Sequence, residues 1–294
     1  MKLLITGSNG QLGWELCRQG KDRGFSTVPL DIPEFDITDE ASVRKVFLEA
    51  GPDLVINAAA YTAVDKAESD QEMAFSVNSD GPYYIASACN EKKIPLIHIS
   101  TDYVFDGCKD GPYDNTDQVC PIGIYGKSKS EGEERVRHIL REHIIVRTAW
   151  LCGVHGNNFV KTMLKLGRER EEIRVVADQY GCPTFAADLA GALLTIASKI
   201  DNGQRNSWGT YHYCGTGSTT WFGFASKIFE TAGTYEEFKV KKVIPIKTSE
   251  YPTAATRPSN SVMDCSSLGQ EFNICPPHWE DSLSCMLEAL LPEG

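Results

Sequence analysis

KLLITGSNGQLG, at residues 2–13, begins with a short apolar run of strand type and continues into glycines spaced G-x-x-G-x-x-G. Residues 11–20 then show the apolar periodicity of a helix. Glycines between a strand and a helix let the backbone turn tightly and bring the amides of the helix N-terminus onto a pyrophosphate. Gly7, Gly10 and Gly13 are therefore predicted to form a dinucleotide-binding turn, although a glycine turn without a ligand has the same spacing.

The alternation of strands and helices continues through the first half of the chain. Predicted strands lie at residues 2–6, 26–30, 54–57, 95–100 and 144–148. Predicted helices lie between them, at residues 11–20, 40–49, 73–90 and 127–140. Such alternation is typical of parallel strands joined by right-handed crossovers. The predicted fold class is α/β, a Rossmann-type doubly wound parallel sheet with a smaller C-terminal substrate-binding lobe.

The spacing changes after Trp150. Helical patterns follow at residues 158–170, 188–199, 220–232 and 279–290, separated by loops rich in glycine and proline. We therefore predict a dinucleotide-binding domain at residues 1–150 and a substrate-binding lobe at 151–294. The chain is expected to return to the first domain around residues 173–200, with a strand of the main sheet at 173–176.

Charge and cysteine usage exclude several classes of partner. The net charge of -11 opposes binding to nucleic acid, which favours a basic surface. No apolar run reaches the roughly twenty residues of a membrane span, and the first apolar run is too short for a secretory signal. The ten cysteines form no C-x-x-C pair, so we expect reduced thiols, no zinc site and a cytoplasmic protein.

Asp31 ends the second predicted strand, where an acid commonly accepts hydrogen bonds from the adenosine ribose. Its charge would repel a 2′-phosphate, so this residue favours NADH over NADPH. The alternative is a solvated loop acid. The small residues 57–60 follow the third strand and would let a dinucleotide lie close, although simple packing gives the same composition.

Thr101, Tyr125 and Lys129 form a candidate catalytic set. Thr101 closes the fourth strand, and the other two lie four residues apart at the start of the next helix, on one face. Reduction of a ketone requires a neutral acid near the carbonyl oxygen, and tyrosine keeps its proton at neutral pH. A nearby ammonium would lower the pKa of Tyr125, and the Thr101 hydroxyl would donate to the same oxygen. A Tyr-x-x-x-Lys pair alone occurs by chance on many helices, so the prediction depends on the order of all three features.

With these features the chain resembles the dTDP-4-dehydrorhamnose reductase family of extended short-chain dehydrogenases. The resemblance runs along nearly the whole length and is carried by the glycine turn and by NAAAYTAVD at 57–65, STDYVF at 100–105, YGKSK at 125–129, RTAW at 147–150, GNNF at 156–159, DQYG at 178–181, Pro183-Thr184 and Arg257-Pro258. It implies reduction of the C4 keto group of a nucleotide-linked 6-deoxysugar, dTDP-4-dehydro-L-rhamnose, with NADPH or NADH as cofactor.

The resemblance also implies a role for individual residues. Tyr125 would donate the proton, with Lys129 and Thr101 completing the catalytic set. Implied cofactor contacts are Gly10, Gln11, Leu12, Asp31, Asp36, Ile37, Ala60, Tyr61, Thr62, Ile99, Tyr125 and Lys129. Implied substrate contacts are Thr101, Asp102, Tyr125 and Trp150. Arg257 would face the diphosphate, with a solvated surface arginine as the alternative.

Some members of this family bind magnesium between subunits through glutamates, one of which matches Glu15. The later position that supplies another acid is Ala187 here, beside Asp188. Loss of a carboxylate weakens a site for a hard cation. We therefore predict no metal and no metal-bridged dimer, and a protein that is a monomer or a homodimer.

Two other functions fit part of the pattern. A nucleotide-sugar epimerase or dehydratase would share the fold and Tyr-x-x-x-Lys, but dehydratases of this superfamily carry Asp-Glu after the threonine, and here Tyr103 follows Asp102. A non-catalytic regulatory subunit, like the beta subunit of methionine adenosyltransferase, would keep the dinucleotide fold. The missing second acid argues against a dehydratase, and the intact set of Thr101, Tyr125 and Lys129 argues against a regulatory subunit. An epimerase is distinguished from a reductase by whether the cofactor is consumed.

Overall fold

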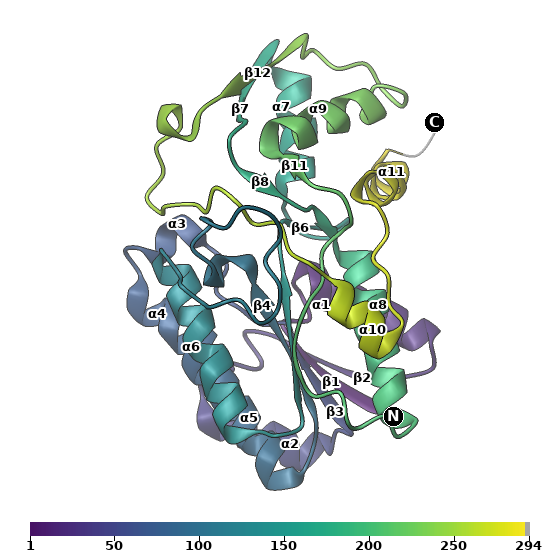
Figure 1. The fold of residues 1–294 in the computed structure, drawn as a ribbon. Coiled ribbons are helices and arrows are strands. Elements are labelled where there is room, and N and C mark those ends of the chain that lie inside the picture. The colour runs from purple at the N-terminus through teal and green to yellow at the C-terminus, as the bar shows by residue number, and fades with distance from the viewer. Residues whose placement is uncertain (292–294) are drawn as a thin grey trace.

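The computed structural model describes residues 1–291, which form a three-layer α/β domain with a smaller lobe above the carboxyl edge of its sheet (Figure 1). The central sheet has six strands in the order β10-β5-β4-β3-β1-β2, all parallel. Their bounds are β1 Lys2–Thr6, β2 Ser26–Leu30, β3 Leu54–Asn57, β4 Leu96–Thr101, β5 His143–Thr148 and β10 Gly209–His212. The order reverses between β1 and β3, which is where α/β sheets of this kind bind ligands.

Helices cover both faces of this sheet. One face packs against α1 (Gln11–Asp22), α8 (Ala186–Asp201) and α10 (Ser266–Phe272). The other packs against α2 (Glu40–Ala50), α5 (Gly81–Lys92) and α6 (Ile124–Ile139). The inner strands β1, β3, β4 and β5 are almost entirely buried, as expected for a sheet between two helical layers, whereas the edge strand β2 is partly exposed.

The segment between β3 and β4 is longer than one helix. It contains α3 (Val64–Ala67), α4 (Gln71–Phe75) and a π-helical turn at Ser76–Asp80 that leads directly into α5. A single helix was predicted at residues 73–90. The π-helical turn lies against α6, the helix that carries the predicted catalytic tyrosine and lysine.

The lobe has its own core and short sheets. Its main elements are α7 (Phe159–Glu169), β7 (Glu172–Val176), α9 (Trp221–Ala232), β12 (Lys242–Ile246) and α11 (Trp279–Leu290). Two small pairs join β6 (Leu151–Cys152) to β9 (Thr184–Phe185) and β8 (Tyr180–Gly181) to β11 (Thr219–Thr220). Short 3-10 turns lie at Asp102–Val104 and Thr248–Glu250. Within residues 1–291, no helix combines the length and apolar character that a membrane crossing requires.

The chain returns to the first domain by another route than the predicted one. The strand expected at residues 173–176 is present as β7, but it pairs with β12 in the lobe and contributes nothing to the main sheet. The return is made by α8, which packs on α1, and then by β10, which pairs with β5. An apolar pattern can predict that a segment forms a strand, but it does not determine which strand or which sheet that segment pairs with.

Candidate active site

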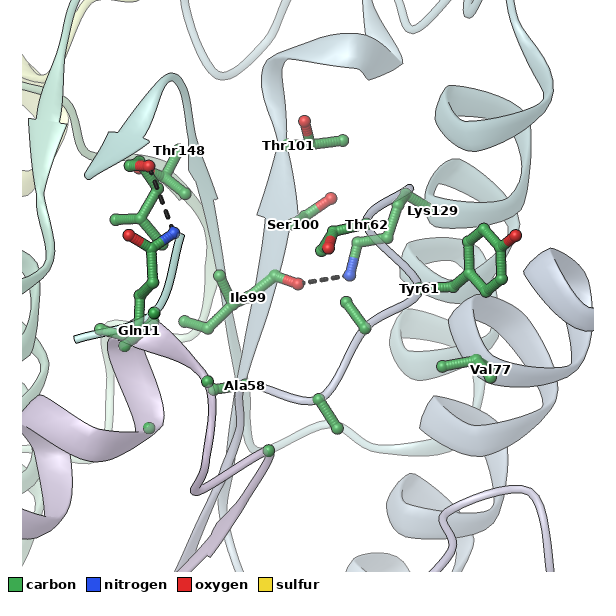
Figure 2. Close-up of a pocket in the computed structure, with 18 of the residues that line it drawn as sticks. Gln11, Ala58, Tyr61, Thr62, Val77, Ile99, Ser100, Thr101, Lys129 and Thr148 are labelled. Atoms are coloured by element: carbon green, nitrogen blue, oxygen red, sulfur yellow. Dashed lines mark hydrogen bonds between the residues drawn. The ribbon is translucent and has the colours of Figure 1, made fainter. Parts of the chain in front are cut away.

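A cavity of about 940 Å³ runs along the carboxyl edge of the central sheet. Its floor is formed by the ends of the strands and by the turn between β1 and α1, and α6 forms one wall (Figure 2). A volume of this size falls in the range of small-molecule and cofactor sites. The cavity lies at the point where the strand order reverses.

The structure brings nearly all of the predicted site residues to this cavity. Those that line it are Gly7, Gly10, Gln11, Leu12, Gly13, Asp31, Asp36, Ile37, Ala60, Tyr61, Thr62, Ile99, Thr101, Asp102, Tyr125, Lys129 and Trp150. Within residues 1–291, Arg257 is the one predicted contact that is not part of the lining. The individual roles of these residues remain predictions.

The glycine turn is held by close backbone packing. Gly7 has a φ of +68°, and a Cβ there would lie 2.6 Å from the amide nitrogen of Ala59. A Cβ on Gly13 would lie 2.0 Å from the carbonyl oxygen of Gly7. Side chains at these positions would push the turn away from the sheet, so the glycines are what lets α1 start at the floor of the cavity.

Asp31 lies at the end of β2, beside the glycine turn. Its carboxylate accepts hydrogen bonds from the backbone amides of Asn9, at 2.7 Å, and Ile32, at 2.8 Å. The acid is therefore fixed at the cavity rather than extended into solvent. In dinucleotide-binding folds, an acid at the end of the second strand lies beside the adenosine ribose, and Asp31 occupies this position.

Thr101, Tyr125 and Lys129 come together from β4 and α6. All three are buried, with exposed fractions of 4%, 9% and 2%. The Lys129 Nζ donates a 2.6 Å hydrogen bond to the carbonyl oxygen of Ile99, which directs the ammonium at the sheet below Thr101 (Figure 2). The sequence-predicted set is thus assembled in one place.

Burial sets the proton affinity of Tyr125. Removal from water raises the pKa of the Tyr125 phenol to about 12, while the Thr101 hydroxyl opposes the shift and the charge of Asp102 adds to it. Lys129 was expected to lower this pKa, but it is not among the groups that shift it, and its ammonium donates instead to the Ile99 carbonyl. Tyr125 therefore holds its proton firmly at neutral pH.

Burial shifts the pKa values of Lys129 and Asp102 in opposite directions. Desolvation lowers the pKa of Lys129 to about 8, with Glu133 acting against the shift. Desolvation raises the pKa of Asp102 to about 6, with Thr101 among the groups that oppose it. The Thr101 hydroxyl donates to Asp102 at 2.9 Å, so it must turn away from this acid before it can donate to a ligand.

Comparison with known proteins gives the family. The RmlD substrate binding domain matches residues 1–291. A dTDP-4-dehydrorhamnose reductase from Aggregatibacter actinomycetemcomitans is 44% identical over 284 residues, which make up 96% of this chain and 97% of that relative. The chain belongs to the dTDP-4-dehydrorhamnose reductase family. The resemblance found in the sequence motifs is confirmed.

Solved structures of this reductase family confirm the fold class. The crystal structure from Clostridium acetobutylicum superposes with a TM-score of 0.92 at 41% identity and covers 99% of both chains. The structure from Bacillus anthracis, solved in complex with NADP, gives a TM-score of 0.91 at 41% identity, with 98% of this chain and 99% of that chain covered.

Trp150 forms the wall of the cavity on the lobe side. Its backbone has a φ of +48°, which is uncommon for a residue with a large side chain. The indole stacks on Trp221 with ring centres 3.6 Å apart and planes 11° from parallel. Gly181 lies against the same ring, since a Cβ there would come within 2.5 Å of it. The lobe thus fixes the orientation of Trp150.

Trp221 does not line the cavity, but it holds the ring of Trp150, and the sequence analysis missed it. It is the first residue of α9, whose start is capped by the Thr220 hydroxyl accepting from the amide of Gly223 at 3.0 Å. The string S-T-T-W carries the capping signal, so the start of the helix could be predicted. The contact with Trp150 could not, because it joins residues far apart in the sequence.

Arg257 is engaged by a carboxylate. Its guanidinium makes a two-point contact with Asp65, at 2.7 Å and 3.1 Å, and this contact lowers the pKa of Asp65. Asp65 also accepts from the amide of Ala255. The pair ties the segment after residue 250 to α3. A contact between Arg257 and a substrate diphosphate remains a prediction, and it would require this pair to open.

Within residues 1–291, no cluster of three or more His, Cys, Asp or Glu side chains is arranged to hold a metal. Glu15, which matches the metal-binding position of some family members, is buried and accepts hydrogen bonds from Arg18 and Gln19. Ala187 contributes only its carbonyl, to Gln19.

Proposed function

We propose that this protein uses NADPH or NADH to reduce the C4 keto group of dTDP-4-dehydro-L-rhamnose to the hydroxyl of dTDP-L-rhamnose. The observation that carries the proposal is the single cavity that joins the glycine turn to Thr101, Tyr125 and Lys129. The names of its family relatives support the choice of substrate. The relative solved with NADP supports the choice of cofactor.

The residues present fit a nicotinamide dinucleotide. The glycine turn opens α1 onto the cavity, and the small residues 58–60 line the floor beside it. Asp31, Tyr61, Thr62 and Lys129 would hold the two riboses and the nicotinamide. When bound, this cofactor supplies a hydride to the substrate carbon.

The side chains of the chain supply the proton and stabilise charge. Tyr125 holds its proton at neutral pH and would donate it to the C4 oxygen as negative charge develops there. The Lys129 ammonium, once it has turned from the Ile99 carbonyl, would stabilise the phenolate that remains. Thr101, once turned from Asp102, would donate to the same oxygen, and the Trp150 ring would pack against the deoxysugar.

Residues 1–150, with the returning α8 and β10, would bind the dinucleotide, and the lobe within 151–294 would bind the sugar nucleotide. We also propose a cytoplasmic protein, a monomer or a homodimer without a bridging metal. Ten cysteines without a C-x-x-C pair support a reducing compartment.

The proposed function is tested by incubating the purified protein with dTDP-4-dehydro-L-rhamnose and each reduced dinucleotide. We expect one cofactor oxidised for each dTDP-L-rhamnose formed. Conversion of the sugar without net cofactor oxidation would instead identify an epimerase or dehydratase. No conversion, together with tight binding to a partner protein, would identify a regulatory subunit.

Asp31 is predicted to set the cofactor preference. We expect kcat/KM for NADH to exceed that for NADPH in the wild type, because a fixed carboxylate repels a 2′-phosphate. Asp31→Asn should shift the ratio toward NADPH by about tenfold, which corresponds to removing one repulsive contact of about 1.4 kcal/mol. Asp22→Asn, an exposed acid on α1, serves as the control and should leave the ratio unchanged. An equal ratio in Asp31→Asn and wild type would remove Asp31 from this role.

A further inference from the structure

Three charged side chains are buried together beside the cavity. Lys129, Glu133 and Arg147 have exposed fractions of 2%, 0% and 2%. Lys129 and Glu133 are one turn apart on α6, and Arg147 lies on β5, in register with Ser100 of β4. Charged groups are rarely buried this completely, because their removal from water is costly. The cavity chemistry described above uses only Lys129.

Both carboxylate oxygens of Glu133 accept hydrogen bonds from arginines. Arg147 donates to both of its carboxylate oxygens, from Nε at 2.9 Å and from Nη2 at 2.7 Å. Arg137, one turn further along α6, donates to one of the same oxygens at 2.5 Å. Burial acts to raise the pKa of Glu133, but the bonds and charge of Arg147 and Arg137 outweigh it and the pKa is lowered. Glu133 is therefore ionised throughout the neutral range.

We propose that Glu133 is a positioning residue for the reduction proposed above: its buried carboxylate keeps the Lys129 ammonium charged and, through Arg147, fixes α6 against the sheet. This inference rests on the proposed function for the meaning of Lys129. It adds a residue that acts through another and does not itself line the cavity.

The charges around Lys129 support the electrostatic half of the proposal. On α6, Tyr125 and Glu133 lie one turn to either side of Lys129, and Glu133 in turn pairs with Arg137 and with Arg147 of β5. On β4, burial and the charges of Lys129 and Arg137 lower the pKa of His98 well below its usual value, so this ring is neutral. The charge of Asp102, just past β4, raises the pKa of Tyr125 and the pKa of Tyr103. Glu133 is the acid that opposes the loss of the proton from Lys129.

The proposal that Glu133 fixes α6 against the sheet depends on the contacts of Arg147. Its guanidinium lies over the ring of Phe105, 5.1 Å from the ring centre, and Phe105 in turn stacks on Tyr113 at 4.2 Å. Phe105 ends the short segment that begins with Thr101. The ion pair thus connects the helix that carries Tyr125 and Lys129 to the segment that carries Thr101. A buried ion pair adds little net stability over apolar packing, so stability alone does not account for it.

The test compares the pH dependence of kcat/KM in Glu133→Gln, Arg147→Gln and the wild type. Loss of activity at high pH should report deprotonation of Lys129, near its pKa of about 8. Glu133→Gln removes the stabilising charge, so this alkaline limb should move to lower pH by about one unit. Arg147→Gln leaves Glu133 less neutralised, so the limb should move to higher pH. Glu131→Gln, on the same helix but only half-buried and paired with Arg135, is the control and should not shift it.

A purely structural role would reduce folding stability in both variants without opposite shifts. The proposal is therefore overturned if the alkaline limb of kcat/KM stays at the wild-type pH in both variants, or if it moves in the same direction in both. If Glu133→Gln does not fold, Glu133→Asp keeps the charge but shortens the contact with Arg147. It should retain the wild-type limb and lose kcat, and a shifted limb would count against the proposal.

Failure of the proposed function can be told apart from failure of this inference. A wild type that does not reduce the sugar nucleotide rejects the function. The same comparison is then made with the pH dependence of NADPH binding, followed by fluorescence, because Lys129 is a predicted cofactor contact. Opposite shifts of the binding curve in Glu133→Gln and Arg147→Gln would support the inference, and identical curves would reject it.

Discussion

Replacement of Tyr125 by phenylalanine is expected to lower kcat by roughly 10²- to 10⁴-fold, the usual contribution of a positioned general acid. The affinity for NADPH or NADH should change little. The variant removes one hydroxyl and keeps the ring, which packs edge-to-face on Tyr103 with centres 5.3 Å apart. Steady-state kinetics and a direct cofactor titration on the same preparation measure both effects.

Tyr103 provides the matched control for this substitution. It is a second phenol that lines the cavity, and burial raises its pKa even further than that of Tyr125. Tyr103→Phe should keep kcat within about tenfold of the wild type, because no proton transfer depends on it. Comparable rates for Tyr125→Phe and wild type would overturn the assignment, as would an equal loss in both phenylalanine variants.

The pKa of about 12 for Tyr125 also bears on the pH profile. The phenol remains protonated well above neutral pH, so its ionisation cannot cause a loss of activity near pH 8. Lys129 is the buried cavity group whose pKa lies there. The alkaline limb therefore reports the ammonium, and this separation makes the Glu133 and Arg147 variants interpretable.

The first half of the chain could be predicted closely because each element carries its own local signal. The strand at residues 2–6 has the predicted bounds, and α6 begins three residues before the predicted start. The glycine turn and the set of Thr101, Tyr125 and Lys129 also follow from local order, since parallel strands end at the same edge of the sheet. These features need no knowledge of distant contacts.

The elements that the sequence did not predict correctly depend on contacts between distant segments. Residues 173–176 form a strand, but its partner is β12, about seventy residues later. The sixth strand of the sheet, β10, has only four residues and includes Thr210 and His212, so its pattern is weak. The pairing of β10 with β5 decides where the chain rejoins the sheet.

The charged residues of α6 also show that contacts with distant segments are hard to predict from local sequence. The stretch SEGEER, at residues 130–135, has the composition of a solvated helix face. Glu131 is half-buried and pairs with Arg135, whereas Glu133 is fully buried against Arg147. No local pattern separates the two glutamates. Arg257 is a similar case, since no local pattern indicates that its guanidinium pairs with Asp65.

Replacement of Lys129 by methionine is expected to abolish most turnover and to make the fold more stable at the same time. We predict that kcat falls by roughly 10²-fold or more and that NADPH binds about tenfold more weakly, because the ammonium contributes to both steps. Methionine fills a similar buried volume without a charge. Lys127→Met, at an exposed position on the same helix, should change neither.

The stability of this variant has a definite pH dependence. Burial lowers the pKa of Lys129 to about 8, below its ordinary value of 10.5, so the folded state disfavours the ammonium. Below pH 8 the lysine is charged in both states, and the wild type carries the full cost of burying it. Between pH 8 and 10.5 the unfolded chain binds more protons than the folded one, so the wild type gains stability as pH rises. The advantage of Lys129→Met should therefore be largest below pH 8 and shrink above it, as measured by chemical denaturation. A variant that is less stable than the wild type at pH 7 would show that Lys129 is held for structure, and its loss of activity could then not be assigned to catalysis.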